Sequence, residues 1–445
     1  MDSCKSSFDT ALHAAPGDCD GYVFPPGFLW GAATSSHQVE GGNRWNDWGA
    51  AEQAGRLAHA SGEACQHYER YEQDFDLAQS WGHKAHRLSL EWSRIEPVEG
   101  TWNPEAIAHY RDVIRALRQR DLEPVVTLHH FTNPAWFIRQ GGWLRRDSVA
   151  RFARYVDYVM QQLGPEVTYW LTINEPTVYV MQGYVNGEWP PFVRGAWSKA
   201  IRVCYHMARA HVMAYRLIHQ HHAGARVGFA HSAPWVMPCR ADKRWDRMAA
   251  ILRDCILNRA FFGFMGNRIH GRRTPAAHLD FLGINYYMRT LIRSKGWGLG
   301  RILGRACHES HHTDQGVLSD IDWEVYPAGL RAILNKFAHL GVPLFITENG
   351  IATTDESLRC EFLKRHLTAL AETIEHDRIA VIGYLYWSLL DNFEWSEGFR
   401  ARFGLASVDD ITQQRIPRPC ADLFAQVCRS NSLPSHVQSV DPIPD

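Results

Sequence analysis

Apolar runs of strand length recur along the chain, and several of them end in polar or charged residues. From Tyr169 to Ile173 every residue is β-branched, aromatic or apolar, and the next three are Asn174, Glu175 and Pro176. A short continuous run of this kind is typical of a buried strand. Proline cannot donate a hydrogen bond to a sheet, so the strand should end there. A carboxylate therefore follows a buried strand directly.

A second apolar run has the same ending. The stretch 343–352 contains Glu348, followed by Asn349 and the turn-forming Gly350. One such carboxylate is usually a solvated loop residue, but two of them suggest a pair. Six more runs are predicted strands: 28–36, 85–92, 123–130, 226–233, 280–287 and 381–389.

Stretches with helical periodicity lie between these strands. In 104–120, for example, Ile107, Tyr110, Ile114 and Leu117 fall on one face. Further predicted helices are 148–164, 324–341 and 356–377. Parallel strands need a crossover connection, usually a helix, so eight strands alternating with helices predict an α/β fold, a single closed (β/α)8 TIM barrel.

The chain contains no linker rich in Pro, Gly or Ser that would divide it into domains. We expect one barrel domain over 21–430, a flexible N-terminal extension over 1–20 and a C-terminal tail over 431–445. The segment 291–320 contains several glycines and arginines together with His308, His311 and His312. We expect it to be a long loop that leaves the mouth of the barrel.

The barrel also predicts which polar residues meet. Catalytic groups in this architecture come from the carboxyl ends of several strands. The polar and aromatic residues expected to converge there are Gln38, Arg87, His130, Asn174, Glu175, Asn285, Tyr287, Glu348 and Trp387.

The charge balance narrows the class of partner. Lys and Arg number 47 and Asp and Glu 48, which argues against nucleic acid or an anionic membrane as a partner. The ten cysteines show no CxxC motif, and the N-terminus lacks the features of a signal peptide. We expect a cytoplasmic protein with a small neutral ligand, and its oligomeric state stays open.

A metal-dependent hydrolase is an alternative, because the chain has 24 histidines and two of them, His129 and His130, are adjacent. Adjacent strand residues point to opposite faces, so only one can face the mouth. No spaced cluster of ligands completes a metal site. We expect no metal and no cofactor.

Two five-residue motifs identify a family. "TINEP" (172–176) and "ITENG" (346–350) resemble the acid/base and nucleophile motifs of glycoside hydrolase family 1, the β-glucosidase family. Supporting blocks are "FLWGAATSSHQVEG" (28–41), "RLSLEWSRI" (87–95), "LGINYY" (282–287), "WEVYPAGL" (323–330) and "WSLLDNFEWSEGF" (387–399). The resemblance covers nearly all of residues 24–417.

The resemblance implies roles for five residues. Glu175 is expected to be the general acid/base and Glu348 the nucleophile of a retaining glycosidase, with carboxyl groups about 5–5.5 Å apart. Arg87 matches the arginine that keeps the nucleophile ionised, and Glu175 should stay protonated near neutral pH. Asn285 and Tyr287 match the pair at the reaction centre.

The sugar-binding residues carry over in the same way. By resemblance, Gln38, His130, Asn174, Glu394 and Trp395 bind the sugar hydroxyls, and Trp387 stacks on the ring. Phe403 is also expected to be a substrate-binding residue. Relatives that act on 6-phosphorylated sugars have Ser, Lys and Tyr where this chain has Glu394, Ala401 and Phe403. The resemblance therefore implies an exo-β-glycosidase for unphosphorylated β-D-glucosyl residues, with β-galactosidase or β-fucosidase side activity.

Three departures from the family pattern leave the preferred substrate open. The common "HWDLP", "HAPG" and "VYVD" are "HFTNP" (130–134), "EWPP" (188–191) and "ASVD" (406–409) here. Two alternatives share the same site: a transglycosylase and a catalytically weak sugar-binding relative. Such relatives typically lose one glutamate, whereas Glu175 and Glu348 are both present.

Overall fold

Eight parallel strands close into a barrel at the centre of the molecule. The computed structural model describes residues 21–266, 277–296, 298–307 and 316–434. The strands neighbour one another in the order β11-β12-β2-β3-β4-β5-β6-β8 and then close. Their bounds are β2 (Leu29–Ala33), β3 (Ala85–Ser89), β4 (Glu123–Thr127), β5 (Tyr169–Asn174), β6 (Arg226–Ser232), β8 (Leu282–Asn285), β11 (Leu344–Asn349) and β12 (Val381–Trp387). All eight predicted strands are present, and the (β/α)8 TIM barrel is confirmed.

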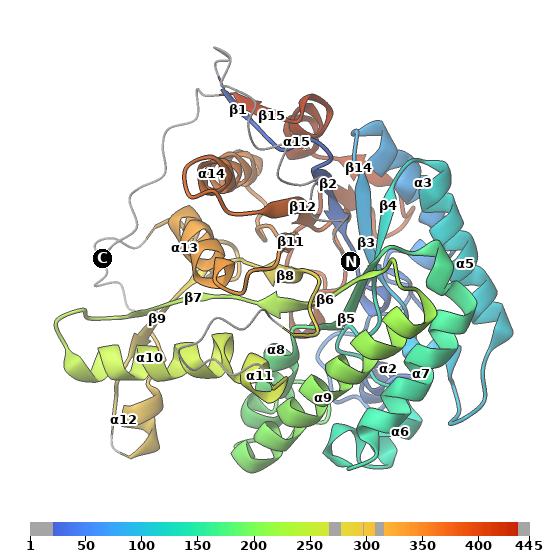
Figure 1. Cartoon of the computed structure of the whole chain (residues 1–445), viewed down its shortest axis with the longest axis horizontal. Coiled ribbons are helices and arrows are strands. Elements are labelled where there is room, and N and C mark those ends of the chain that lie inside the picture. Colours follow the sequence, from blue (N-terminus) through green and yellow to red (C-terminus); the bar gives the residue numbers. More distant parts are fainter. Residues whose placement is uncertain (1–20, 267–276, 297, 308–315, 435–445) are drawn as a thin grey trace, which may run out of the picture.

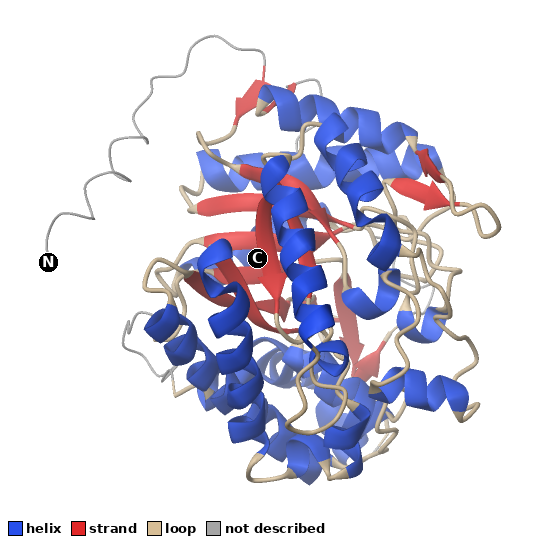
Figure 2. Cartoon of the chain, turned by 90° about the vertical axis from the view of Figure 1, so that its right-hand side faces the viewer, coloured by secondary structure: helices blue, strands red, loops and turns tan. Residues whose placement is uncertain are grey.

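Helices surround the barrel on its outside (Figure 1), and Figure 2 shows the strands in red enclosed by helices in blue. The long helices are α3 (His67–Ser80), α5 (Pro104–Gln119), α7 (Ser148–Leu163), α9 (Trp197–His221), α10 (Arg244–Asn258), α13 (Pro327–Ala338), α14 (Glu356–Glu375) and α15 (Pro419–Ser430). Short ones are α1 (Ser36–Val39), α2 (Asp47–Gln53), α4 (Trp92–Ile95), α6 (Ala135–Arg139), α8 (Pro176–Val180), α11 (Ala260–Phe264) and α12 (Leu299–Leu303). Helix α8 continues into a π-helical turn, η3 (Met181–Asn186).

Two apolar layers hold this arrangement together. The larger lies between the strands and the helices, and the smaller fills the barrel interior. Ala33, Ala85 and Leu171 of the inner layer leave room for the rings of Phe281 and Phe345. As far as the described residues show it, the interior of the barrel is thus filled with side chains, as is usual for this architecture.

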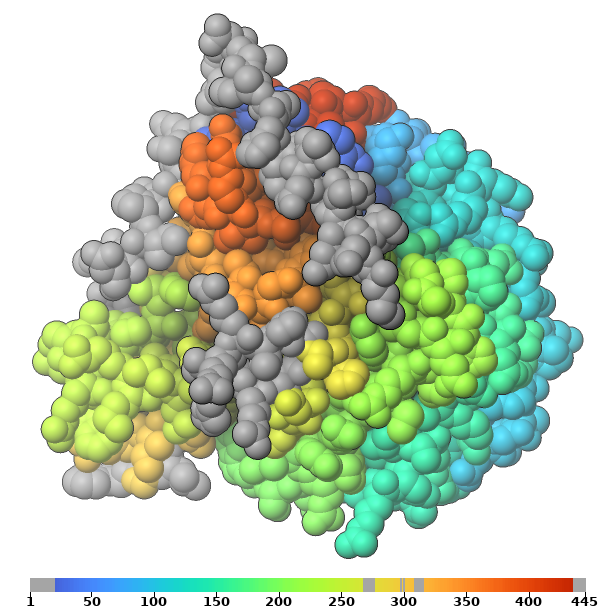
Figure 3. All heavy atoms as spheres, in the orientation of Figure 1, coloured from blue at the N-terminus to red at the C-terminus, as the bar shows by residue number. Residues whose placement is uncertain are grey.

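The segment 291–320 differs from the expected loop. Strand β9 (Arg289–Arg293) lies between β7 (Trp235–Pro238) and β10 (Arg305–Ala306) in a three-stranded sheet. Together with α10 and α12 this sheet forms a lobe at the side of the barrel (Figure 1 and Figure 3). Ile292 is buried against Ala249 and Ala250 of α10, which explains why so short a stretch forms a strand. Residues 308–315, with the three histidines, lie outside the described residues.

The two ends of the described chain pair with each other. Strand β15 (Ser432–Pro434) runs antiparallel to β1 (Gly21–Val23), so the beginning of the expected tail is part of the fold. Residues 1–20 and 435–445 lie outside the described residues. A further small sheet joins β13 (Ala406–Val408) and β14 (Arg415–Pro417). None of the helices in the described ranges is both long and apolar enough to span a lipid bilayer.

Candidate active site

A cavity of about 460 Å³ opens at the carboxyl ends of the barrel strands. Ten of the twelve residues predicted from the sequence line it: Gln38, His130, Glu175, Asn285, Tyr287, Glu348, Trp387, Glu394, Trp395 and Phe403. The other two, Arg87 and Asn174, are buried and hydrogen-bond to residues of the lining. The structure therefore gathers all twelve residues at one place.

Glu175 directly follows strand β5. Its backbone N–H still bonds to the carbonyl of Ala230 in β6 at 2.8 Å, and Pro176 then begins helix α8. Its φ of 41° lies in the left-handed region, which non-glycine residues seldom adopt. The side chain is 7% exposed. An unusual backbone conformation thus places a largely buried carboxyl group in the cavity.

Glu348 is the next-to-last residue of β11, and two donors hold its carboxylate. Arg87 Nη1 donates to Oε1 at 2.5 Å, and the Tyr287 hydroxyl donates to Oε2 at 2.6 Å. Arg87 comes from β3 and is fully buried. With each oxygen bonded to a separate donor, the carboxylate is fixed in orientation.

Asparagine side chains connect the two glutamates. Asn285 Nδ2 donates to Glu175 Oε1 at 2.7 Å and to Asn174 Oδ1 at 3.1 Å. Asn174 Oδ1 also accepts from Arg87 Nη2 at 2.6 Å. Thr347, the neighbour of Glu348, donates to Asn285 Oδ1 at 2.6 Å. Residues of four strands thus form one hydrogen-bonded network around the carboxyl pair.

The two carboxyl groups differ in charge state. Burial raises the pKa of Glu175 to about 8, and the negative charge of Glu348 adds to this rise. Burial also raises the pKa of Glu348, but the Arg87 guanidinium and the Tyr287 hydroxyl act in the opposite direction. Glu348 forms a direct ion pair with Arg87 and Glu175 has no such partner, so the ionised form is favoured at Glu348 and the protonated form at Glu175.

A second set of polar side chains, around Gln38 and Glu394, lines another part of the cavity. Gln38 Nε2 donates to Glu394 Oε2 at 3.0 Å, and Ser35 fixes the Gln38 carbonyl oxygen at 2.6 Å. Burial and the charge of Glu348 raise the pKa of Glu394 to about 8. The raised pKa favours the protonated form of Glu394, which can present both a donor and an acceptor to a sugar hydroxyl.

His130 and two tryptophans complete this part. The imidazole lies nearly parallel to Trp387 and Trp395, with both ring centroids 6.1 Å away. Burial and the nearby charge of Arg87 hold the pKa of His130 well below its usual value, so the ring is neutral. His129 does not line the cavity and pairs instead with Asn133 at 3.0 Å. The sequence predicted that only one of the two histidines would face the mouth, although both follow β4, which ends at Thr127.

Several lining residues were not predicted from the sequence. Trp189 and Trp323 lie in the motifs "EWPP" (188–191) and "WEVYPAGL" (323–330), so a signal existed for both. Leu257 of α10, Met288 and Ile321 also line the cavity. They left no signal, because an apolar residue in a helix or beside a strand is normally a core residue.

The described residues include no group of three or more His, Cys, Asp or Glu side chains arranged to hold a metal ion. The arrangement combines the arginine-paired Glu348 with two carboxyl groups of raised pKa, Glu175 and Glu394, and with neutral hydrogen-bonding and aromatic side chains. It can combine nucleophilic attack with proton donation at a neutral polar substrate.

Comparison with known proteins places the chain among glycosidases. The sequence model of glycosyl hydrolase family 1 matches residues 21–272 and 271–433. The structure is similar to a β-glycosidase from Pyrococcus horikoshii, with a TM-score of 0.85, 40% identity, and coverage of 93% of this chain and 96% of that one. It is also similar to a Thermotoga maritima β-glucosidase in complex with glucoimidazole, with a TM-score of 0.82, 27% identity, and coverage of 92% and 99%.

Among curated relatives, a 6-phospho-β-galactosidase from Lacticaseibacillus casei is 31% identical, covering 92% of this chain and 99% of the relative. A β-galactosidase from Pyrococcus woesei is 29% identical, covering 94% and 99%. The names of these relatives differ in both the sugar and its phosphorylation.

Proposed function

The chain belongs to glycosyl hydrolase family 1 and is an O-glycoside hydrolase, and from that premise we propose that it is a retaining exo-β-glycosidase. Its substrates would be terminal, unphosphorylated β-D-glucosyl residues, with β-galactosidase or β-fucosidase side activity. The supporting observation is the difference between the two glutamates: Glu348 is ion-paired with Arg87, whereas Glu175 has a pKa of about 8.

These charge states fit a double displacement. In the first step the Glu348 carboxylate bonds to the anomeric carbon, and the bond to the leaving oxygen breaks as Glu175 protonates that oxygen. Glu175 is then ionised and takes a proton from water, whose oxygen attacks the anomeric carbon and releases Glu348. Both glutamates return to their starting states. This mechanism requires the carboxyl groups to be about 5–5.5 Å apart.

The charge of the cavity supports an unphosphorylated sugar. Among the described residues that line it there is no lysine and no arginine. Its ionisable acids are Glu175, Glu188, Glu348, Glu394 and Glu397. A phosphate would lose its hydration without gaining a cationic partner, at a large cost in free energy.

The remaining lining supports a leaving group with apolar surface. Val178, Leu257, Met288, Ile321 and Trp323 contribute apolar side chains to the cavity outside the polar group around Gln38 and Glu394. An alkyl or aryl group can bury its apolar surface there, and it has no hydroxyl groups that would be left without hydrogen-bond partners.

Hydrolysis of a matched panel of p-nitrophenyl glycosides tests the proposal. The purified protein, without added metal, is offered the β-glucoside, β-galactoside, β-fucoside, β-mannoside and 6-phospho-β-glucoside, together with octyl β-glucoside. We expect fast release from the unphosphorylated β-glucoside, and NMR should detect the β-anomer of glucose first. A first-formed α-anomer would exclude retention, and a faster 6-phospho substrate would exclude the proposed sugar. If the folded protein hydrolyses none of these substrates, the sugar-binding alternative is favoured. Products longer than the substrate would favour transglycosylation.

A further inference from the structure

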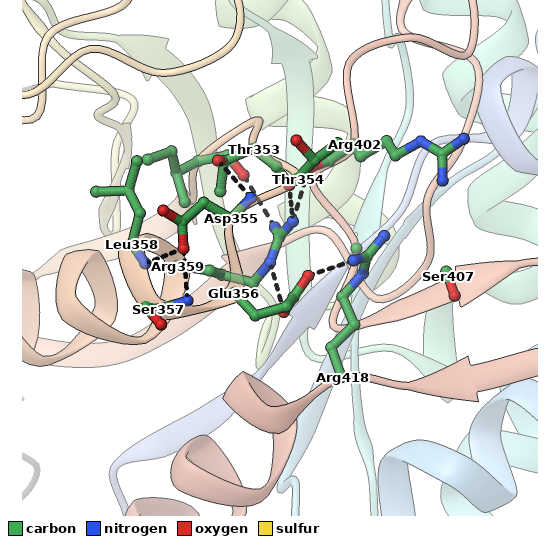
Figure 4. A network of polar contacts seen from close by, with 12 residues as sticks. Thr353, Thr354, Asp355, Glu356, Ser357, Leu358, Arg359, Arg402, Ser407 and Arg418 are labelled. Carbon is green, nitrogen blue, oxygen red and sulfur yellow. Dashed lines mark hydrogen bonds and ion pairs between the residues drawn. The ribbon is translucent and has the colours of Figure 1, made fainter.

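A buried arginine in the first turn of α14 donates hydrogen bonds to three backbone carbonyls (Figure 4). Arg359 is fully buried, and its Nη1 donates to the carbonyl of Ile351 at 3.1 Å. Its Nη2 donates to the carbonyl of Arg402 at 3.1 Å and also to that of Thr353. Figure 4 shows the guanidinium between the segment that precedes α14 and the segment that contains Arg402.

Both segments lead directly to the cavity. Residues 351–353 follow β11, whose Glu348 is the proposed nucleophile, and Arg402 precedes Phe403, which lines the cavity. The two segments also bond to each other, because Thr353 N–H donates to the Arg402 carbonyl at 3.1 Å. Arg359 therefore fixes the junction between the nucleophile strand and one wall of the sugar pocket.

A third segment of the wall joins the same junction. Asp320 N–H donates to the carbonyl of Ala352 at 2.9 Å, and the Asp320 carboxylate accepts from Thr354 N–H at 2.8 Å. Ile321 and Trp323, which follow Asp320, line the cavity. The position of this segment therefore depends on residues 352–354. Arg359 holds the backbone of these residues through the carbonyl of Thr353.

The wall packs against Tyr287. The ring of Tyr287 lies 5.3 Å from that of Trp323 and 5.9 Å from that of Phe403, both in edge-on contact. The hydroxyl of the same tyrosine donates to Glu348 at 2.6 Å. Any displacement of Phe403 or Trp323 would thus move a donor away from the nucleophile.

Local preference does not explain an arginine at this position. A cation near a helix N-terminus is unfavourable for the helix dipole, and Asp355 already caps α14 by accepting from two backbone N–H groups. A buried guanidinium also needs partners to offset its desolvation, and Glu356, 3.4 Å away, offers only one charge. The tertiary contacts to three carbonyls account for its presence.

We propose that Arg359 is a positioning residue for glycoside hydrolysis: it holds the segments that carry Phe403 and Trp323 so that the Tyr287 hydroxyl stays on Glu348. This inference rests on the proposed glycosidase function.

The variants Arg359→Met and Arg359→Lys test it, with Arg331→Met as the matched control. Arg331 of α13 also makes three polar contacts, two to Asp377 at 2.8 Å and one to Glu372 at 3.1 Å, and it does not line the cavity. For all proteins, kcat and KM for p-nitrophenyl β-glucoside are measured across pH, together with the melting temperature. We expect Arg359→Met to lower kcat by about 10-fold or more, because small displacements of reacting groups are costly.

In Arg359→Met the acidic limb of kcat/KM should also move to higher pH, since Glu348 loses a donor that favours its ionised form. Arg359→Lys should recover part of kcat, and Arg331→Met should lower the melting temperature but leave kcat and the pH profile unchanged. If Arg359→Met does not fold, Asp320→Asn, which loosens the same wall, should shift kcat and the acidic limb in the same direction.

The results separate this inference from the proposed function. The positioning role alone is overturned if the wild type is active and the Arg359 or Asp320 variant has the same kcat and the same acidic limb. Equal changes in Arg331→Met also overturn it, since the effect would then follow stability. An inactive wild type overturns both proposals.

Discussion

At the scale of single residues, two glutamates with the same side chain differ because their neighbours differ. Glu348 contacts Arg87, and Glu175 contacts the neutral amide of Asn285. If Glu175 is the proton donor, Glu175→Ala should lose far more activity on an alkyl glucoside than on 2,4-dinitrophenyl glucoside, whose leaving group needs no proton. We expect a loss of about 100-fold or more on the alkyl substrate. Comparing kcat/KM for the two substrates checks this.

Glu348→Ala is the companion variant and should abolish turnover of both substrates, because without the nucleophile neither leaving group can be displaced with retention. Activity above that of mock-purified material would contradict the nucleophile assignment. An equal loss on both substrates in Glu175→Ala would contradict the acid assignment.

The pKa of Glu175 also predicts a pH dependence. The folded value of about 8 lies above the usual value of 4.5, so activity that needs the proton should fall as pH rises through about 8. The same raised pKa means that the wild type loses stability as pH rises from about 4.5 to about 8, because over this range Glu175 ionises in the unfolded chain but keeps its proton in the folded protein. Glu175→Gln has no such proton to lose.

Denaturant unfolding at pH 6 and pH 9 measures the effect on the free energy of unfolding. The wild type should lose more stability between these two pH values than Glu175→Gln does. A basic limb that remains in the variant would belong to Glu394, whose pKa is also raised to about 8. A variant and wild type with parallel stability profiles would show that Glu175 does not titrate in this range.

The residues that the sequence predicted are those with distinctive chemistry in recognisable motifs. Glu175 and Glu348 end apolar runs, and such a contrast is visible without a structure. Leu257 and Met288 could not be found, because their side chains look like core. Arg359 could not be found either, since its partners are backbone carbonyls, which no sequence pattern marks.

At the scale of elements, periodicity predicted the barrel strands and helices, and local chemistry sets where they end. Helix α5 begins after Asn103, whose side chain accepts from Glu105 N–H at 3.0 Å and Ala106 N–H at 3.4 Å. Asn103→Ala should lower the free energy of unfolding by about 1 kcal/mol, because these two donors lose their partner. Asn103→Asp, which keeps the acceptor, should stay close to the wild type.

Chemical denaturation of the three proteins measures this difference, and glycosidase activity should be equal in all of them because Asn103 does not line the cavity. Equal stabilities would show that the cap is replaced by water at no cost. Strand β9, by contrast, was missed: its two apolar residues are too few for a periodic signal, and only packing against α10 reveals them.

At the scale of the whole molecule, the closed barrel was predictable because eight similar strands with helical connections leave few other topologies. The pairing of the chain ends was not, since Ser432–Pro434 is short and follows a helix that already looks like the end of the fold. Asn431 reinforces this pairing: its Nδ2 donates to the Phe24 carbonyl at 2.8 Å, and its Oδ1 accepts from Trp30 Nε1 at 2.8 Å.

If this pairing stabilises the barrel, its buried side chain should matter and its exposed one should not. Leu433 of β15 is 1% exposed, whereas Val23 of β1 is 67% exposed. Leu433→Ala should therefore lower the free energy of unfolding by about 2–5 kcal/mol, the usual cost of emptying a core position. Val23→Ala should change it by about 0.5 kcal/mol or less.

Denaturant unfolding measures both, and kcat should be unchanged because neither residue lines the cavity. Similar small effects for both variants would mean that the strands pair without contributing to the stability of the barrel.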